Sequence, residues 1–148
     1  MNEIKITVDP NLGITAAADS KGNKAAALCH PNDKFDEEKG IRLALERLMT
    51  PINYDDTVFV KPSLDGKEPF LEPKLANYII NYLVCRLGVL PGAYLDKIDR
   101  DPQCINVKTV RPVQYTLCYE TGDGWSIVEN KLTGKIAITK PDSIVKLS

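Results

Sequence analysis

Residues 71–87 have the sequence LEPKLANYIINYLVCRL, and the rest of the chain must pack around this stretch. Pro73 suits the first position of a helix, where its missing N–H would be unpaired in any case. Gly88 and Pro91 mark the end of that helix. Apolar side chains cover most of its circumference, and the polar stripe that remains is narrow and consists of Lys74, Asn77 and Asn81. A helix that is apolar nearly all round is buried, so we expect it at the centre of the fold or against a partner chain.

The composition is that of a soluble globular protein. The chain has 148 residues, of which 43% are apolar and 26% charged, which predicts a single domain over residues 1–148 with a substantial core. Its 19 Lys and Arg residues are balanced by 20 Asp and Glu residues. This balance argues against binding long nucleic acid, which needs many phosphate contacts, but it leaves room for a small anionic ligand. The central helix is too short and too polar to cross a membrane.

The cysteines suggest neither a metal site nor disulfide bonds. They are Cys29, Cys85, Cys104 and Cys118, and no two of them have the close spacing of a zinc site. We expect Cys85 in the helix and Cys118 in a strand to be small core residues. The first residues lack the apolar run of a signal peptide. Free thiols without an export signal predict a cytoplasmic protein, and no motif indicates a cofactor.

The N-terminal third predicts an antiparallel meander followed by a helix. Alternating apolar residues indicate strands at 4–8, 12–18 and 25–29, joined by turns at 9–11 and 21–23. Asp36 is a typical N-cap for a helix over residues 37–49. The spacing places Ile41, Ala44, Leu45 and Leu48 on its inner face and Arg42, Glu46 and Arg47 outside. Gly40 lowers helix propensity by roughly 1 kcal/mol against Ala, which indicates a packing role.

The C-terminal half predicts a second antiparallel sheet. A short strand is expected at 58–60, and the alternation at 105–119 is unusually long, with Arg111 on its apolar side. Further strands are expected at 125–129, 135–140 and 143–147. The predicted fold class is therefore α+β, with an antiparallel N-terminal β-meander, two α-helices of which one is largely buried, and a C-terminal antiparallel β-sheet.

The densest polar cluster, CHPNDKFD at residues 29–36, has more than one interpretation. Catalysis by Cys29 and His30 is disfavoured because neighbours on an extended chain point to opposite faces. A metal site formed by His30, Asp33 and Asp36 would need further histidines, and His30 is the only one in the chain. A strand-to-helix turn fixed by Pro31 and by Asn and Asp caps explains the residues most simply. We therefore expect a protein that is not an enzyme.

The same cluster resembles a known pattern. Residues 29–36, with Gly40, Leu43 and Ala44, match C-x-P-x-D-x-F-D-x3-G-x2-[IL]-A, which is similar to a pattern in small proteins from phages of Gram-positive hosts. Proteins of this size and layout include the anti-Thoeris sponges, which sequester cyclic ADP-ribose signals and assemble as oligomers. The resemblance implies a phage anti-defence protein in the host cytoplasm that binds a small anionic nucleotide without degrading it.

Candidate ligand residues follow from the chemistry of an anion site. Arg111 interrupts an apolar strand face, so its guanidinium must be paired with a carboxylate of the fold or with a ligand phosphate. Arg86, at the end of the central helix, and Arg100, in the loop after it, are weaker candidates that also suit a solvated surface. The aromatic residues Tyr94, Tyr115 and Trp125 are able to stack on a base, although each also suits a core.

Two other functions remain open from the sequence. The protein could instead block a host defence enzyme by direct contact, or it could hydrolyse the signal. We also expect a homo-oligomer, because two sheets of short strands would leave part of an all-round apolar helix uncovered.

Overall fold

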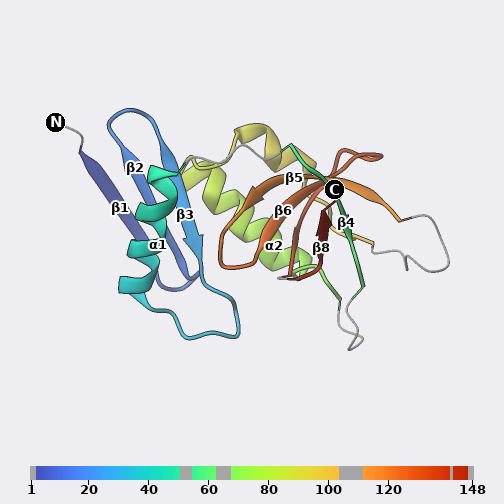
Figure 1. The fold of residues 1–148 in the computed structure, drawn as a ribbon, viewed down its shortest axis with the longest axis horizontal. Coiled ribbons are helices and arrows are strands. Elements are labelled where there is room, and N and C mark those ends of the chain that lie inside the picture. Colours follow the sequence, from blue (N-terminus) through green and yellow to red (C-terminus); the bar gives the residue numbers. More distant parts are fainter. Residues whose placement is uncertain (1–2, 51–54, 63–67, 104–111, 141, 147–148) are drawn as a thin grey trace.

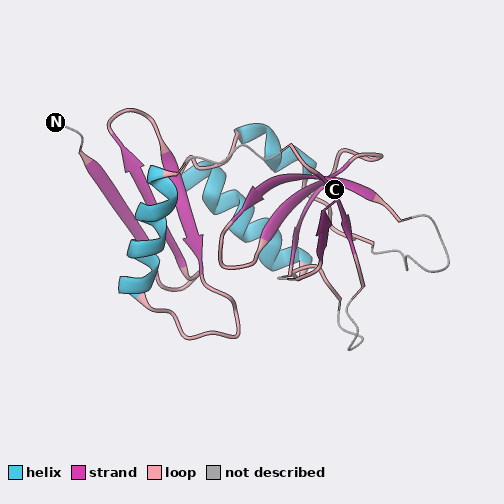
Figure 2. Ribbon diagram, viewed as in Figure 1, coloured by secondary structure: helices cyan, strands magenta, loops and turns pink. Residues whose placement is uncertain are grey.

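Two antiparallel β-sheets and two main helices make up the fold (Figure 1). The computed structural model describes residues 3–50, 55–62, 68–103, 112–140 and 142–146. The N-terminal lobe consists of the three-stranded sheet and helix α1 (Glu37–Met49), and the C-terminal lobe consists of the five-stranded sheet with its loops. Figure 2 shows α1 against the N-terminal sheet and the second helix between the two sheets. The predicted α+β fold class is confirmed.

The N-terminal sheet is the predicted meander, with strand order β1-β2-β3. Its strands are β1 (Ile4–Asp9), β2 (Ile14–Asp19) and β3 (Lys24–Leu28). The carboxylate of Asp9 accepts the N–H groups of Asn11 and Leu12 and closes the first turn. That turn continues through Gly13, whose φ is +69°. The second strand therefore begins at Ile14 and not at Leu12.

Helix α1 spans Glu37–Met49, as predicted, and Asp36 caps it by accepting the N–H of Lys39. Ala44 and Leu48 are buried against the small alanines of β2 and β3, so the helix lies close to the sheet. The predicted orientations differ from the structure in two respects. Ile41 and Leu45, expected on the inner face, are only half-buried and line a hollow along the outside of the helix. Arg47 points not to solvent but to the C-terminal lobe. Helical periodicity does not predict this orientation, because the partner of Arg47 in that lobe is distant in sequence.

The C-terminal sheet has the strand order β7-β6-β5-β4-β8 and all its pairings are antiparallel. Its strands are β4 (Thr57–Val60), β5 (Gln114–Glu120), β6 (Ser126–Asn130), β7 (Ile136–Thr139) and β8 (Ile144–Lys146). The second half of the long alternating stretch therefore forms β5. Its first half, including Arg111, lies outside the described residues.

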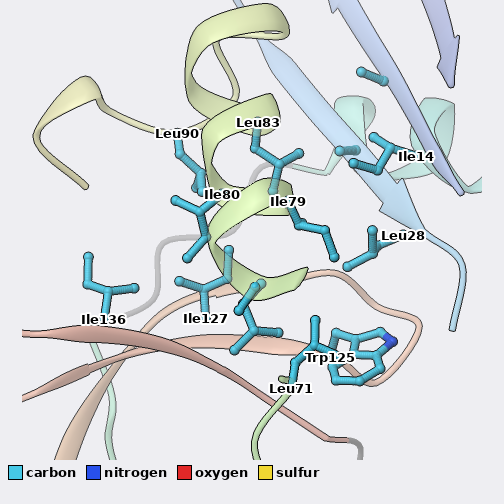
Figure 3. Packing of buried hydrophobic residues seen from close by; sticks show 14 residues of the cluster. Ile14, Leu28, Leu71, Ile79, Ile80, Leu83, Leu90, Trp125, Ile127 and Ile136 are labelled. Atoms are coloured by element: carbon cyan, nitrogen blue, oxygen red, sulfur yellow. The ribbon is translucent and has the colours of Figure 1, made fainter. Parts of the chain in front are cut away.

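The central helix consists of α2 (Pro73–Asn81) and a π-helical turn (Tyr82–Arg86), followed by Gly88 with φ +61°. A 3₁₀ helix (Gly92–Lys97) follows within the loop. Figure 3 shows side chains of this helix packed between the two lobes. They form one cluster with residues of both sheets, among them Ile14, Leu28, Ile79, Ile80, Leu83, Trp125, Ile127 and Ile136.

The helix is nevertheless not covered all round. Its buried residues are Ala76, Ile79, Ile80 and Leu83. Tyr78 is 63% exposed, and Cys85 is exposed although the sequence predicts a core cysteine. The two sheets contact the helix from only part of its circumference, so an apolar residue on the remaining side faces outward. Cys118 on β5 is half-buried, close to expectation.

Polar side chains join the lobes along the free edge of β3. The hydroxyl of Tyr119 accepts the N–H of Ala26 at 3.1 Å and donates to its carbonyl at 3.3 Å. Arg47 donates to the same carbonyl at 2.9 Å, and Asp123 accepts the N–H of Leu28 at 2.8 Å. These side chains form hydrogen bonds with backbone groups of β3 that, on an uncovered edge strand, would be free to pair with another strand.

Candidate functional site

The CHPNDKFD cluster forms the turn between β3 and α1, as its turn residues predict. The ring nitrogen Nδ1 of His30 accepts the N–H of Asn32 at 3.2 Å, and the His30 carbonyl accepts the N–H of Asp33 at 2.9 Å. At the start of the turn, the N–H of Cys29 donates to the Gly13 carbonyl at 2.7 Å. The turn is thus fixed at both ends, by β2 and by the Asp36 cap.

This turn is also the wall of a pocket, which we call the motif pocket. Its volume is about 320 Å³, within the range of small-molecule sites. It lies between the start of α1, the β2 and β3 strands and the loop before β6. The lining residues are Gly13, Thr15, Ala27, Cys29, His30, Asp33, Lys34, Phe35, Asp36, Lys39, Gly40, Leu43, Gly122 and Asp123.

Only some of the charged side chains that line the motif pocket are free to contact a ligand. Asp36 caps α1, and Asp123 accepts both the Leu28 N–H and the Arg47 guanidinium at 3.3 Å. Lys34 and Lys39, by contrast, form no ion pair within the part of the chain that the structure describes. Lys34, Lys39 and Asp33 therefore remain to meet a ligand, while the formal charges of the two lysines are balanced by those of Asp33 and Asp36.

An aromatic pair supports one side of the pocket. His30 stacks on Trp125, with 4.8 Å between the ring centroids and 28° between the ring planes. Trp125 is only 1% exposed and belongs to the core, so it holds the imidazole in place. A fixed, half-exposed aromatic ring at a pocket wall is a surface on which a flat group can stack.

The arrangement does not suit thiol chemistry. Burial, with the nearby Asp33 and Asp123 carboxylates, raises the pKa of the Cys29 thiol, although Lys39 acts in the opposite direction. The thiol lies 3.5 Å from the carbonyl of His30, while the imidazole of His30 is occupied by Asn32 and Trp125. A nucleophilic cysteine needs a lowered pKa and a base in contact with it.

Two buried polar atoms next to the motif pocket have no hydrogen-bond partner among the described residues. They are the hydroxyl of Thr15, which lines the pocket, and the indole N–H of Trp125, beneath His30. Buried polar groups are nearly always paired, so such exceptions concentrate where water, a ligand or strain is found.

Of the arginines expected to bind a ligand, the two that the structure describes lie outside the motif pocket. Arg86 is exposed at the end of the π-helical turn, beside a hollow of about 280 Å³ that also contains Tyr78 and Tyr82. Arg100 lines a different hollow of about 520 Å³ together with the three carboxylates Asp96, Asp99 and Asp101. The three carboxylates outnumber the two cations of this hollow, Arg100 and Lys135, which disfavours an anion there. Arg111 lies outside the described residues.

The expected aromatic residues are mainly structural. Tyr94 is half-buried beside Cys118, and burial, followed by that neighbour, raises the pKa of Tyr94 to about 12. Tyr115 is buried, donates to the carbonyl of Gln103 at 3.1 Å and packs against Phe70. The structure thus places Arg86, Arg100, Tyr94 and Tyr115 outside the motif pocket.

Sequence reasoning missed Lys34, Lys39 and Thr15 as pocket residues. The signal available was the density of polar residues in the CHPNDKFD cluster, which we interpreted as a turn. A turn and a pocket wall have the same local sequence signature, and only the position of Asp123 and Trp125 opposite distinguishes them.

No group of three or more potential metal ligands occurs among the described residues. Within the same residues, no helix is long and apolar enough to span a bilayer. No known family model, curated protein or solved structure matches the chain. Function is therefore inferred from the pocket's own residues.

Proposed function

We propose that this protein binds a small anionic nucleotide in the motif pocket and releases it chemically unchanged. In this proposal it is a phage anti-defence protein that acts in the host cytoplasm by sequestering a cyclic ADP-ribose-type immune signal. The pocket residues support the binding of an anion. The resemblance of the CHPNDKFD cluster to a pattern of small phage proteins supplies the biological context and the ligand class.

The observation that carries the proposal is that the two lysines of the pocket have no ion-pair partner among the described residues. Asp36 and Asp123 are engaged in holding the fold, whereas Lys34 and Lys39 form no ion pair with any described residue. A phosphate that enters between the two lysines gains charge-assisted hydrogen bonds, which are stronger than those between neutral groups.

The size and walls of the pocket support a nucleotide in particular. A volume of about 320 Å³ is at the lower end of the ligand-site range, so part of a cyclic dinucleotide-sized ligand would remain at the open mouth. His30, held flat by Trp125, offers a stacking surface for a base. The Thr15 hydroxyl, which has no hydrogen-bond partner among the described residues, adds a polar group to the pocket wall.

The state of Cys29 supports binding without chemistry. Its raised thiol pKa leaves little thiolate at neutral pH, and the imidazole of His30 is held by other groups. Sequestration requires only that the ligand be held, so the absence of an activated nucleophile is no obstacle to it.

The test is to recover the ligand after binding. Purified protein is incubated with cyclic ADP-ribose, separated from free ligand by gel filtration, heat-denatured and analysed by chromatography. We expect intact cyclic ADP-ribose in the released fraction. Recovery of a cleaved product would contradict the proposal in favour of hydrolysis. Failure of the protein to take up the ligand would contradict it in favour of direct contact with a defence enzyme.

Variants then locate the ligand. The double variant Lys34→Glu/Lys39→Glu should weaken binding about tenfold or more, because it replaces attraction for phosphate by repulsion. Lys74→Glu, an exposed lysine on α2, is the matched control and should bind normally. If Arg111→Ala abolishes binding while the double variant binds normally, the site lies at that arginine and not in the motif pocket.

A further inference from the structure

The outer face of α1 carries an apolar surface that no other described element covers. A hollow of about 820 Å³ lies along it, lined by Glu38, Ile41, Arg42, Leu45, Glu46 and Met49, with Thr50 at its end. Met49 is 78% exposed, and Ile41 and Leu45 are only half-buried. Spaced four residues apart, these three form one stripe along the helix. A surface helix normally presents polar residues there.

A row of charges runs beside this stripe. Glu38, Arg42 and Glu46 also follow one another at intervals of four residues, so they share a flank of the helix. All three are exposed. Neither Arg42 nor Glu46 forms an ion pair within the described residues. The charges along this flank thus alternate in sign, and both a cation and an anion are available to pair with a partner.

We propose that this face of α1 binds the same face of a second copy of the chain, with the two helices antiparallel. A two-fold axis through an antiparallel pair brings the same flank of both helices together. With the axis at Leu45, Arg42 and Glu46 lie about 4.5 Å and 1.5 Å from it on opposite sides, from the 1.5 Å rise per residue. Arg42 of one copy is then about 3 Å along the helix direction from Glu46 of the other. The two Glu46 carboxylates are also about 3 Å apart along this direction and lie between the two arginines, which offset their mutual repulsion.

The pairing is self-complementary, which is why we assign a second copy as the occupant. Each Arg42–Glu46 contact occurs twice by symmetry, and the apolar stripe of each copy covers that of the other. A helix of 13 residues is about 20 Å long, so the contact is smaller than a standard interface. We therefore expect a reversible dimer in the micromolar range. This assignment is independent of the proposed ligand.

A charge-swap experiment tests the pairing by sedimentation over a concentration series. Arg42→Glu and Glu46→Arg should each weaken association about tenfold or more, because each creates two contacts between like charges. The double variant Arg42→Glu/Glu46→Arg restores the opposite charges and should return the affinity to that of the wild type. Both substituted positions, Arg42 and Glu46, are exposed in the single chain, so unchanged melting temperatures of the three variants serve as the folding control.

Cross-linking tests the antiparallel orientation in a Cys85→Ser background, which removes the exposed native thiol. Leu45→Cys should form a disulfide dimer under mild oxidation, because it lies at the axis. Glu38→Cys should not, because antiparallel packing separates its two copies by about 20 Å. Cross-linking at both positions would overturn the antiparallel arrangement. A wild type that is monomeric at roughly 100 μM, a hundredfold above a micromolar Kd, or a double variant that fails to recover, would overturn the dimer.

Discussion

Gly40 is where α1 comes closest to the sheet beneath it. A Cβ added at Gly40 would overlap the hydroxyl of Thr15 and lie 3.1 Å from its Cβ. The sequence predicts a packing role for this glycine, and the structure identifies Thr15 on β2 as its neighbour. The contact also explains how a helix can approach the sheet at the edge of the motif pocket.

We predict that Gly40→Ala destabilises the protein by about 1–3 kcal/mol, the usual cost of overpacking. The result is informative because alanine favours a helix by about 1 kcal/mol over glycine, so propensity alone predicts the opposite sign. Urea unfolding of wild type and variant measures the difference.

Two further variants separate the causes. Glu38→Ala, an exposed site on the same helix, should change stability by no more than about 0.5 kcal/mol. Gly40→Ala/Thr15→Ala should recover part of the loss, since the overlapping hydroxyl is gone but the Cβ contact remains. A stabilised Gly40→Ala would show that the helix moves away from β2 at little cost.

The edge of β3 depends on side chains from the other lobe. Asp123 is the central residue, since one of its oxygens accepts both the Leu28 N–H and the Arg47 guanidinium. Arg47 and Asp123 side chains are only 16% and 19% exposed. The second ion pair among the described residues, Lys97–Glu129, joins the 3₁₀ helix to β6 with side chains 46% and 29% exposed.

We predict that Asp123→Ala lowers the free energy of unfolding by about 1.5–3 kcal/mol. The Leu28 N–H and the charged Arg47 guanidinium would both lose their acceptor in a largely buried contact. Lys97→Ala is the matched control, and loss of this more exposed pair should cost about 0–1 kcal/mol. Amide exchange gives a local check, since the Leu28 N–H should lose protection only in the Asp123 variant. Equal effects of the two substitutions would show that the contact between the lobes contributes little.

The whole molecule should lose stability in alkali. Burial is the main cause that raises the pKa of Cys29, Cys118, Tyr82 and Tyr119 above their ordinary values of 9.0 and 10.0, and that of Tyr94 to about 12. Between the ordinary and the raised pKa values, these cysteines and tyrosines lose their protons in the unfolded chain first. The unfolded chain therefore binds fewer protons than the folded chain. Stability is then full below about pH 9 and falls as the pH rises toward 12.

Melting temperatures between about pH 8 and pH 11 measure this decline. In Tyr94→Phe, one raised group is absent, so its melting temperature should fall less over the interval above pH 10 than that of the wild type. A wild-type melting temperature that stays constant to pH 11 would contradict the prediction. So would a variant whose decline has the same slope.

Local signals account for the parts of the fold that the sequence predicts well. Asp9 and Asp36 act on backbone groups only two or three residues away, so the meander and the bounds of α1 follow from neighbouring residues. Arg47 and Cys85 were misplaced for the opposite reason. Whether each faces inward depends on how the lobes meet, and the partner of Arg47 is 76 residues away.

The candidate site is predicted only as a cluster. The turn residues around Pro31 are visible in the sequence, but the pocket needs Gly122 and Asp123 from the other lobe. Arginine and tyrosine were chosen by residue type, and type alone does not determine which of them share a cavity. Tyr115, for example, has the chemistry for stacking but is a buried residue of β5 that is hydrogen-bonded to the carbonyl of Gln103.

The side chains of Tyr119, Arg47 and Asp123 that cover the edge of β3 also have a consequence for the newly made chain. The strands β1 to β3 and α1 occupy the first 49 residues and have everything needed for their own pairing. Leu28, however, is separated from Asp123 by 95 residues. At about 5–20 residues per second, a ribosome needs roughly 5–20 s to make that distance. For that time the N-terminal sheet would carry a bare strand edge, and two nascent chains on one messenger would be able to pair through it.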